Sequence, residues 1–465
     1  MDFKKIFGFI PEVKKPSEKK LSFNVKLKWT LIILAAFFIL ANVSLFGLTG
    51  QALERFEYLA IILGTDFGSI ISLGIGPIVM ASIILQLLTG AGIIRINLTT
   101  PEGKKFFQGL QKILVMFFIV FEALVYVLMN GLQAAPGYTG IVIFQLILGG
   151  LAIYYMNEVS EKWGFGSGVS LFIGAGVSWR LIASAFQFIN AQGKSCLLDF
   201  KGTACSGKVL ILIQSIISNQ RDPTAFLSAL AAIVATVVIF LLVVWAQSLK
   251  VEIPLSYGRI RGYGVKWPLS FFYASVIPVI FAAALVANIQ LFGGMFENWL
   301  GHATFLGHFV NGQAVSGLAF WMGSTNILDL TIRGGFLPIY LLQGLTHLIF
   351  FVVLCTIFSI FWVKTSGMDA KAQAEKIASS GLQVAGFRQD QRILESILDR
   401  YIMPLTVMGG AAIGLLASLT DLLGALVSGT AILLVIMIMF QFYQSIAQQH
   451  MTDMNPAMRK FMGNI

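Results

Sequence analysis

The sequence is dominated by long apolar runs, many of them about 20 residues in length, which is enough for a helix to span a bilayer. Only 12% of the 465 residues are charged, and 57% are hydrophobic. Soluble domains carry about a quarter charged residues. The chain is therefore predicted to be an all-α polytopic membrane protein.

We expect ten transmembrane helices, five in each half of the chain. By residue number they cover 28–48, 72–88, 105–129, 138–156, 168–188, 224–247, 269–292, 336–363, 401–419 and 423–443. Two of them have clear start signals. Thr100 and Asp222 each offer a capping side chain just before a proline, which suits the first helical turn.

The distribution of basic residues predicts the orientation of the chain. Most of the 32 lysines and arginines lie on the side of the N terminus, and eight lysines fall in the first 28 residues. Such an excess marks the cytoplasmic side, so ten crossings place both termini in the cytoplasm. Five spans per half make the halves inverted and pseudo-symmetric. The predicted regions are a cytosolic arm (1–27), a first half (28–189), an external hinge loop (190–223), a second half (224–447) and a cytosolic tail (448–465).

The second span is interrupted at its start by the glycines and proline of residues 74–77. Such residues are tolerated at membrane depth where neighbouring helices or a cavity satisfy the freed backbone. We expect a short helix to begin near Pro77, with Ile75 and Val79 one turn apart on one face.

The same pattern returns in residues 276–288, where a proline stands two positions before Ile280. Both segments carry an amide near the far end, Gln86 in the first and Asn288 in the second. Corresponding interrupted segments in two halves predict a central site between repeats. The alternative is that two proline-kinked helices are alike by chance.

Residues 51–66 combine charged side chains with an apolar core that is too short to cross a bilayer. They predict a short helix folded back over the outer mouth of a central cavity. The alternative is an interfacial helix that lies flat on the membrane.

Two cytoplasmic loops, 248–268 and 364–400, are long and basic. Residues 250–266 alternate and then turn, which is typical of a hairpin, with Arg259 and Arg261 at its tip. Basic inner loops are general in membrane proteins, but structured cationic projections suit a polyanionic partner such as RNA.

The sequence holds no phosphate-binding loop, no G-x-S-x-G and no H-E-x-x-H motif, so it predicts neither an enzyme nor a cofactor or metal site. Glu122 is the only acidic residue deep in a span, and such a carboxylate is a candidate proton or ion site. A proton- or ion-coupled secondary transporter of a small solute is therefore an alternative. The candidate central positions are aliphatic, however, and an aliphatic constriction gates by excluding water.

Cys196 and Cys205 bracket a polar loop on the predicted outer side, where oxidising conditions permit a disulfide. The sequence leaves open whether they are bonded. Cys355 lies in an apolar span and is expected to be a small core residue.

Several stretches resemble the SecY family, the large subunits of Sec protein-conducting channels, in its archaeal form. The stretches are LGIGPIV, FQGLQK at 107–112, WGFGSGVSLFI, VEIPLSYGRIRG, IPVIFAAALVANIQL, the GFR of 386–388 and RYIMPLTVMGG. The resemblance covers essentially the full length. It implies two inverted halves around a central pore, through which a partner such as the ribosome drives secretory polypeptides. Transmembrane segments would leave sideways into lipid.

The resemblance also implies roles for particular residues. The pore ring would be Ile75, Val79, Val169, Ile173, Ile280 and Leu416. The plug within 51–66 would include Phe56, Leu59, Ala60, Ile61, Ile62 and Leu63. Gln86, Glu122 and Asn288 would lie at or near a lateral gate between the second and seventh spans, and Arg259, Arg261 and Arg388 would contact the ribosome.

The partners implied by the resemblance are two small membrane subunits of the SecE/gamma and Secbeta types, the ribosome, signal sequences with their nascent polypeptides, and the lipid of the cell membrane. Two positions depart from the family pattern. Val169 stands where isoleucine is frequent, and Met80 stands where some relatives carry a hydroxyl residue at the gate.

Overall fold

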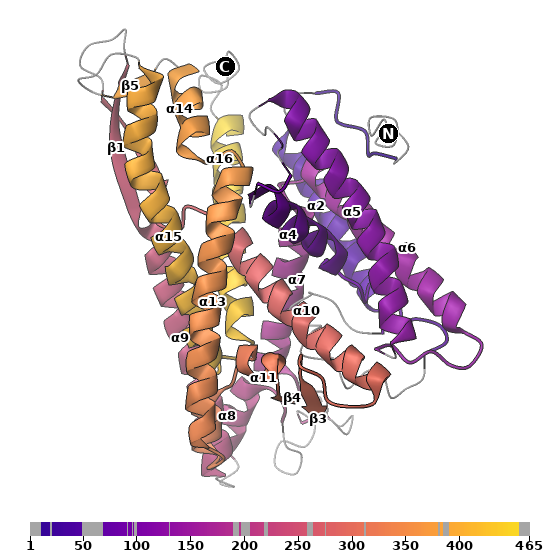
Figure 1. Ribbon diagram of the computed structural model, residues 1–465. Helices are drawn as coiled ribbons and strands as arrows, with labels where there is room; N and C mark the ends of the chain where they lie inside the picture. The colour runs from indigo at the N-terminus through magenta and orange to yellow at the C-terminus, as the bar shows by residue number, and fades with distance from the viewer. Residues whose placement is uncertain are drawn as a thin grey trace.

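The computed structural model describes residues 11–18, 21–48, 68–90, 92–94, 96, 100–129, 131–188, 195–196, 205–217, 222–257, 264–274, 276–310, 313–379, 382–384 and 390–454. This part of the chain is mostly helical (Figure 1). Nine of its helices are long and apolar enough to cross a membrane. They are α2 (Phe23–Ala41), α5 (Pro101–Leu128), α6 (Thr139–Trp163), α7 (Gly168–Phe186), α9 (Pro223–Ser248), α10 (Ile277–Leu300), α13 (Pro338–Thr365), α15 (Gln391–Leu423) and α16 (Gly429–Met454).

A shorter apolar helix, α4 (Gly76–Gly90), follows the interrupted segment of the second predicted span. The nine long helices and α4 coincide with the ten predicted spans. The helix predicted to begin near Pro77 does so, since Pro77 lies in the first turn of α4, and Pro278 likewise lies in the first turn of α10.

The capping predictions are also confirmed. The Thr100 side chain accepts a hydrogen bond from the Gly103 N–H at 3.2 Å, at the start of α5. Asp222 Oδ1 accepts from the Thr224 N–H at 3.3 Å, at the start of α9.

Several predicted boundaries are wrong by five residues or more. The seventh span does not start at 269, because residues 264–270 form strand β2 and the helix begins only at Ile277. The helices α2 and α15 start earlier than the predicted 28 and 401. For α15 the cause is local, since Asp390 caps a polar first turn that an apolarity criterion cannot detect.

The break before α4 is an irregular stretch, residues 68–75, that is nearly all buried. Backbone groups buried in this way need partners. Ser72 Oγ accepts a hydrogen bond from the Gly68 N–H at 2.8 Å, inside the stretch. The Ile70 N–H donates to the Val43 carbonyl at 2.9 Å, so the loop after α2 also provides a hydrogen-bond partner for this stretch.

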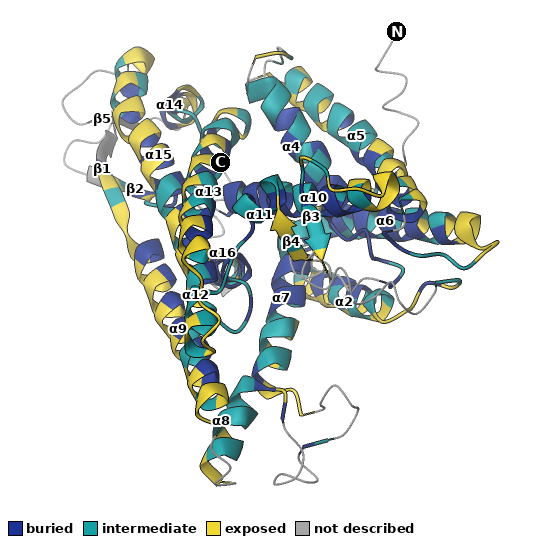
Figure 2. Cartoon of the chain, turned by 60° about the horizontal axis from the view of Figure 1, so that its bottom comes forward, coloured by how far each residue is buried: buried dark blue, intermediate teal, exposed yellow. Residues whose placement is uncertain are grey.

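The spans of the two halves occupy different sides of the molecule. Helices α2, α4, α5 and α6 lie together, α9, α13 and α15 lie opposite them, and α10 crosses between the two groups (Figure 1). Helix α10 packs against both α4 and α13. Figure 2 shows exposed residues along the outward sides of α9 and α15 and buried residues towards the centre. The exposed residues of α9 are largely apolar, which suits contact with lipid.

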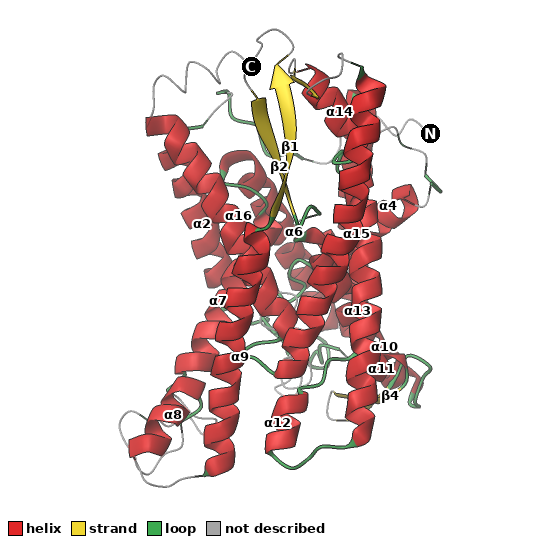
Figure 3. Ribbon diagram, turned by 90° about the vertical axis from the view of Figure 1, so that its left-hand side faces the viewer, coloured by secondary structure: helices red, strands yellow, loops and turns green. Residues whose placement is uncertain are grey.

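A small sheet stands at one end of the molecule (Figure 3). The predicted hairpin is present as β1 (Lys250–Tyr257) and β2 (Gly264–Ser270), and its tip lies outside the described residues. The sequence did not predict the third strand, β5 (Leu382–Val384), which comes from the second basic loop and pairs antiparallel with β1. Helix α14 (Ala370–Ser379) precedes it.

The opposite end carries short elements that the sequence did not predict. The hinge loop 190–223 contains helix α8 (Lys208–Ile217), which packs on α7 and α9. Between α10 and α13 lie β3 (His308–Val310), β4 (Gln313–Ser316), α11 (Leu318–Met322) and α12 (Ile327–Ile332). Cys196 and Cys205 form a disulfide with a Cα–Cα distance of 5.3 Å, which answers the question that the sequence left open.

Close packing at Gly149 gives a direct test of this fold. A Cβ at this position of α6 would overlap the carbonyl oxygen of Ile70, in the irregular stretch before α4. We expect Gly149→Ala to lower the free energy of unfolding by about 1–3 kcal/mol, as overpacking does. Thermal unfolding of the detergent-solubilised protein measures it. Gly140→Ala, in the same helix with nothing within 4 Å of its Cβ, is the control and should be neutral; equal loss in both variants would contradict the packing.

Candidate pore and gate

The six predicted ring residues come from four helices or from residues next to them. Ile75 and Val79 belong to the α4 segment, Val169 and Ile173 to α7, Ile280 to α10 and Leu416 to α15. All six lie in one hydrophobic cluster, four of them buried and two, Val169 and Leu416, partly buried. None of the six lies fully exposed towards lipid. The cluster is large, so sharing it does not by itself make a ring.

Local structure fixes the orientation of these residues. The Val79 N–H donates to the Ile75 carbonyl at 3.0 Å, so the two are stacked one turn apart as predicted. On α7, the Val169 N–H donates to Asn157 Oδ1 at 3.0 Å. Asn157 is a buried side chain of α6 that also leaves no room for a Cβ at Gly168. Its role was missed, because Asn157 stands beside Glu158 and Glu161 in the polar end of α6, where an amide is not unusual.

The candidate gate residues lie on three neighbouring helices. Gln86 of α4 and Asn288 of α10 are 4% and 6% exposed, and these two helices pack directly against each other. The Asn288 amide donates back to the Ala284 carbonyl of its own helix at 2.8 Å. Glu122 is 2% exposed and lies on α5, which packs against α4 and α6.

Two of these polar groups are incompletely satisfied. Gln86 Oε1 and Glu122 Oε1 are buried and have no hydrogen-bond partner among the described residues. A buried oxygen without a partner costs about 1–3 kcal/mol. Packing around α4 is therefore less stable than an all-apolar arrangement of the same shape would be.

The plug residues Phe56, Leu59, Ala60, Ile61, Ile62 and Leu63 lie outside the described residues, and so do Arg259, Arg261 and Arg388. The structure does describe the elements from which the two arginine-bearing loops extend. The sheet, α14 and the first turns of α15 share a second hydrophobic cluster that includes Ile253, Ala374 and Leu398. Tyr273 Oη also donates to the Met368 carbonyl at 2.7 Å. The two basic loops therefore rise from one packed base.

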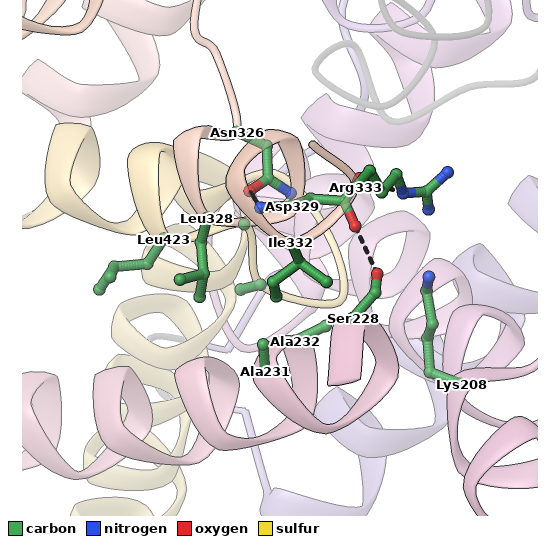
Figure 4. A pocket seen from close by; sticks show the side chains of 12 residues that line it. Lys208, Ser228, Ala231, Ala232, Asn326, Leu328, Asp329, Ile332, Arg333 and Leu423 are labelled. Carbon is green, nitrogen blue, oxygen red and sulfur yellow. Dashed lines mark hydrogen bonds and ion pairs between the residues drawn. The ribbon is translucent and has the colours of Figure 1, made fainter. Parts of the chain in front are cut away.

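A small cavity of about 100 Å³ lies at the opposite end, between α8, α9, α12 and α15. Three of its polar side chains pair with one another: Asp329 accepts a hydrogen bond from the Ser228 hydroxyl and pairs with Arg333 at 2.8 Å (Figure 4). We interpret this cavity and its paired side chains as part of the packing contact between α9 and α12. Among the described residues, no group of three or more His, Cys, Asp or Glu could hold a metal ion.

Comparison with known proteins decides the family. The SecY family model matches residues 69–443 of this chain. The chain belongs to the SecY family. The SecY protein translocase subunit of Methanothermobacter thermautotrophicus is 40% identical to it over 467 residues, covering 99% of this chain and 98% of that protein. The SecY subunit of Archaeoglobus fulgidus is 39% identical, covering 98% of this chain and 97% of that protein.

Solved structures of SecY relatives share the fold. One, described as the structure of a protein conducting channel, matches with a TM-score of 0.83 at 35% identity, covering 98% of this chain and 99% of that one. Sec61 in the canine ribosome-channel complex matches with a TM-score of 0.80 at 35% identity, covering 98% and 99%. The chain is thus a multi-pass helical membrane protein of the SecY fold. The alternative of a coupled solute transporter has no support, and the matched structures are described as channels.

The buried side-chain oxygen of Gln86 on α4 gives a prediction about the stability of the folded protein. We expect Gln86→Leu to raise the free energy of unfolding by about 1 kcal/mol, because it removes a buried oxygen that lacks a hydrogen-bond partner among the described residues. Thermal unfolding in detergent measures the change. Gln108→Leu, at an exposed position of α5, is the control and should have little effect. A clear loss of stability in the Gln86 variant would mean that its amide has a partner in the folded protein.

Proposed function

We propose that this chain is the central subunit of a protein translocation channel. In this role it passes secretory polypeptides across the membrane and releases transmembrane segments sideways into lipid. The observation that carries the proposal is the full-length membership of the SecY family, in which the matched structures are channels. The first turns of α4 and α10 are aliphatic, which agrees with a channel. None of the six ring residues is a polar residue that could bind a small solute.

The proposed pore ring consists of Ile75, Val79, Val169, Ile173, Ile280 and Leu416. Branched aliphatic side chains at a constriction exclude water and ions, yet they can move apart around a polypeptide of any sequence. Support comes from the shared hydrophobic cluster and from the two proline-started helices that contribute three of the residues.

The proposed lateral gate lies between α4 and α10, which pack against each other although they belong to different halves. Gln86, Asn288 and Glu122 place polar groups in or beside this packing. Such groups weaken an apolar seam, so a hydrophobic signal sequence can compete for it. The plug proposed within 51–66 would seal the outer side of the resting channel.

The proposed driving partner is the ribosome, held through Arg259, Arg261 and Arg388. The packed base formed by the sheet and α14 supports this, because a rigid projection loses little entropy on binding. The matched canine Sec61 structure is a ribosome-channel complex. Small membrane subunits of the SecE/gamma and Secbeta types are further proposed partners. The proposed location is the cell membrane, with both termini cytoplasmic.

The ring proposal predicts the effect of a polar substitution at Leu416. We expect Leu416→Asn to loosen the closed state, so that clients with weakened signal sequences are translocated several-fold faster into proteoliposomes. Leu415→Asn makes the same change one residue earlier, at an exposed position of α15, and should not have this effect. Equal behaviour of the two variants would contradict the ring assignment.

The ribosome proposal predicts a salt-dependent complex. We expect the purified complex to bind ribosomes less tightly as the salt concentration rises, because phosphate contacts release counterions. Reversing Arg259 and Arg261 to Glu should abolish most of this binding in a co-sedimentation assay. Lys208→Glu, on α8 at the far end of the molecule (Figure 1), is the control for a charge reversal away from these loops. Unchanged binding by the arginine variant would overturn the assignment.

A further inference from the structure

The segment that precedes α2 is attached to the inner ends of two other helices. Residues 11–18 run past α5 and α6, at the same end of the molecule as the sheet (Figure 1). The Lys162 ammonium donates to the Val13 carbonyl at 2.6 Å, and the Trp163 indole donates to the Lys14 carbonyl at 3.0 Å. The backbone of this segment is therefore held by side chains of α6.

Four charged groups join the segment to both helices. Glu12 pairs with Lys112 of α5 and lies 3.8 Å from the Lys162 ammonium of α6. Glu158 of α6 pairs with Lys162 at 2.6 Å and with Lys112 at 3.6 Å. Its other oxygen accepts the Val13 N–H at 3.2 Å. The Lys112 ammonium beside Glu12 holds the pKa of that carboxyl below its usual range, so Glu12 is ionised at neutral pH.

The arrangement continues to the proposed gate helix. Gln111, next to Lys112 on α5, donates to the Ser82 hydroxyl of α4 at 2.8 Å. Ser82 in turn donates to the Ile78 carbonyl of α4 at 2.8 Å. The part of α5 that contacts the arm is therefore linked to α4 by a hydrogen bond as well as by packing.

A cavity of about 770 Å³ lies between parts of these elements. Its lining includes Glu12, Ile78, Gln111, Lys112 and Glu158, so the arm, α4, α5 and α6 all border it. Helix α5 packs directly on α4 and on α6, but at the cavity their facing atoms are not in contact. Charged and polar links across the rim of the cavity therefore add to what packing contributes to the spacing of these helices.

We propose that residues 11–18 form a strap that ties α5 to α6, and that Glu12 is a positioning residue which sets how readily α4 leaves α10. This inference rests on the proposed function, since it concerns the opening of the lateral gate. With the strap docked, α5 is held and α4 is held with it. When Glu12 loses its charge, the strap loosens, and weaker signal sequences suffice to open the gate.

From the sequence, residues 11–18 are predicted only to belong to a cytosolic arm, and Lys112 has no predicted partner. The charge pattern carries no sign of the pairing, since Glu12 and Lys112 are 100 positions apart. The proposal therefore depends on the folded structure.

The test compares Glu12→Gln with two matched variants in the full complex reconstituted into proteoliposomes. Glu18→Gln makes the same change in the same segment, at an exposed residue that has no ion pair within the described part of the chain, whereas Glu12 pairs with Lys112. Glu12→Asp keeps the charge. The first readout is independent of translocation: trypsin cleavage after Lys14, followed by mass spectrometry, measures how often the strap is undocked. The bond after Lys15 precedes Pro16 and is a poor trypsin site.

The second readout is translocation of a client with a weakened signal sequence, set against one with a strong signal. We expect Glu12→Gln to speed cleavage after Lys14 and to raise translocation of the weak client about two- to fivefold, as loss of a partly exposed ion pair allows. The strong client should be unaffected. Glu18→Gln and Glu12→Asp should behave as the unchanged protein does.

Either of two results would overturn the strap. Cleavage after Lys14 could be unchanged in Glu12→Gln, which would mean that Glu12 does not hold the segment. Alternatively, cleavage could rise while the weak client is translocated as before, which would mean that the segment does not restrain the gate. If the unchanged complex translocated neither client, the proposed function itself would fail, and the role of Glu12 in gating would fail with it.

Discussion

The structure depends on hydrogen-bond partners for the N–H and C=O groups of a buried, non-helical stretch of backbone. Residues 68–75 lie in the interior, and each of their N–H and C=O groups would cost free energy if left without a partner in an apolar setting. Turns within the stretch, the Ser72 hydroxyl and the loop after α2 provide partners. Gly149 of α6 provides the space, because only a glycine lets the Ile70 carbonyl approach so closely. A short α4 can therefore start deep inside the molecule.

A helix that starts inside the molecule leaves room for a central site, and α10 contributes a second such start from the other half. Both begin with a proline in the first turn, where the missing N–H costs nothing. Because α4 and α10 also pack against each other, the same two helices border the proposed ring and the proposed gate. In the proposed channel, opening of the gate and widening of the ring would then be one movement. The proposed strap at α5 and α6 would act on that movement from the side of α4.

Much of this architecture could be predicted from the sequence, because it follows from local chemistry. Apolar length located the spans, capping side chains located the starts of α5 and α9, and Pro77 located that of α4. Long-range pairings could not be predicted. Strand β5 joins β1 across more than 100 residues, and no local pattern specifies its partner. Of the site, the sequence supplied the ring and gate residues mainly through family resemblance. It missed Asn157 and Ser82, whose roles depend on neighbouring helices.

The central claim is that a polypeptide crosses the membrane between the ring residues. Photo-crosslinking from a ribosome-arrested client tests it most directly, with the crosslinking side chain placed in turn at Ile280, at Leu416 and at the exposed Val237 of α9. The account predicts strong crosslinks to the client from the first two positions and none from Val237. Crosslinks from Val237 alone, or equal crosslinks from all three positions, would contradict a path through the centre.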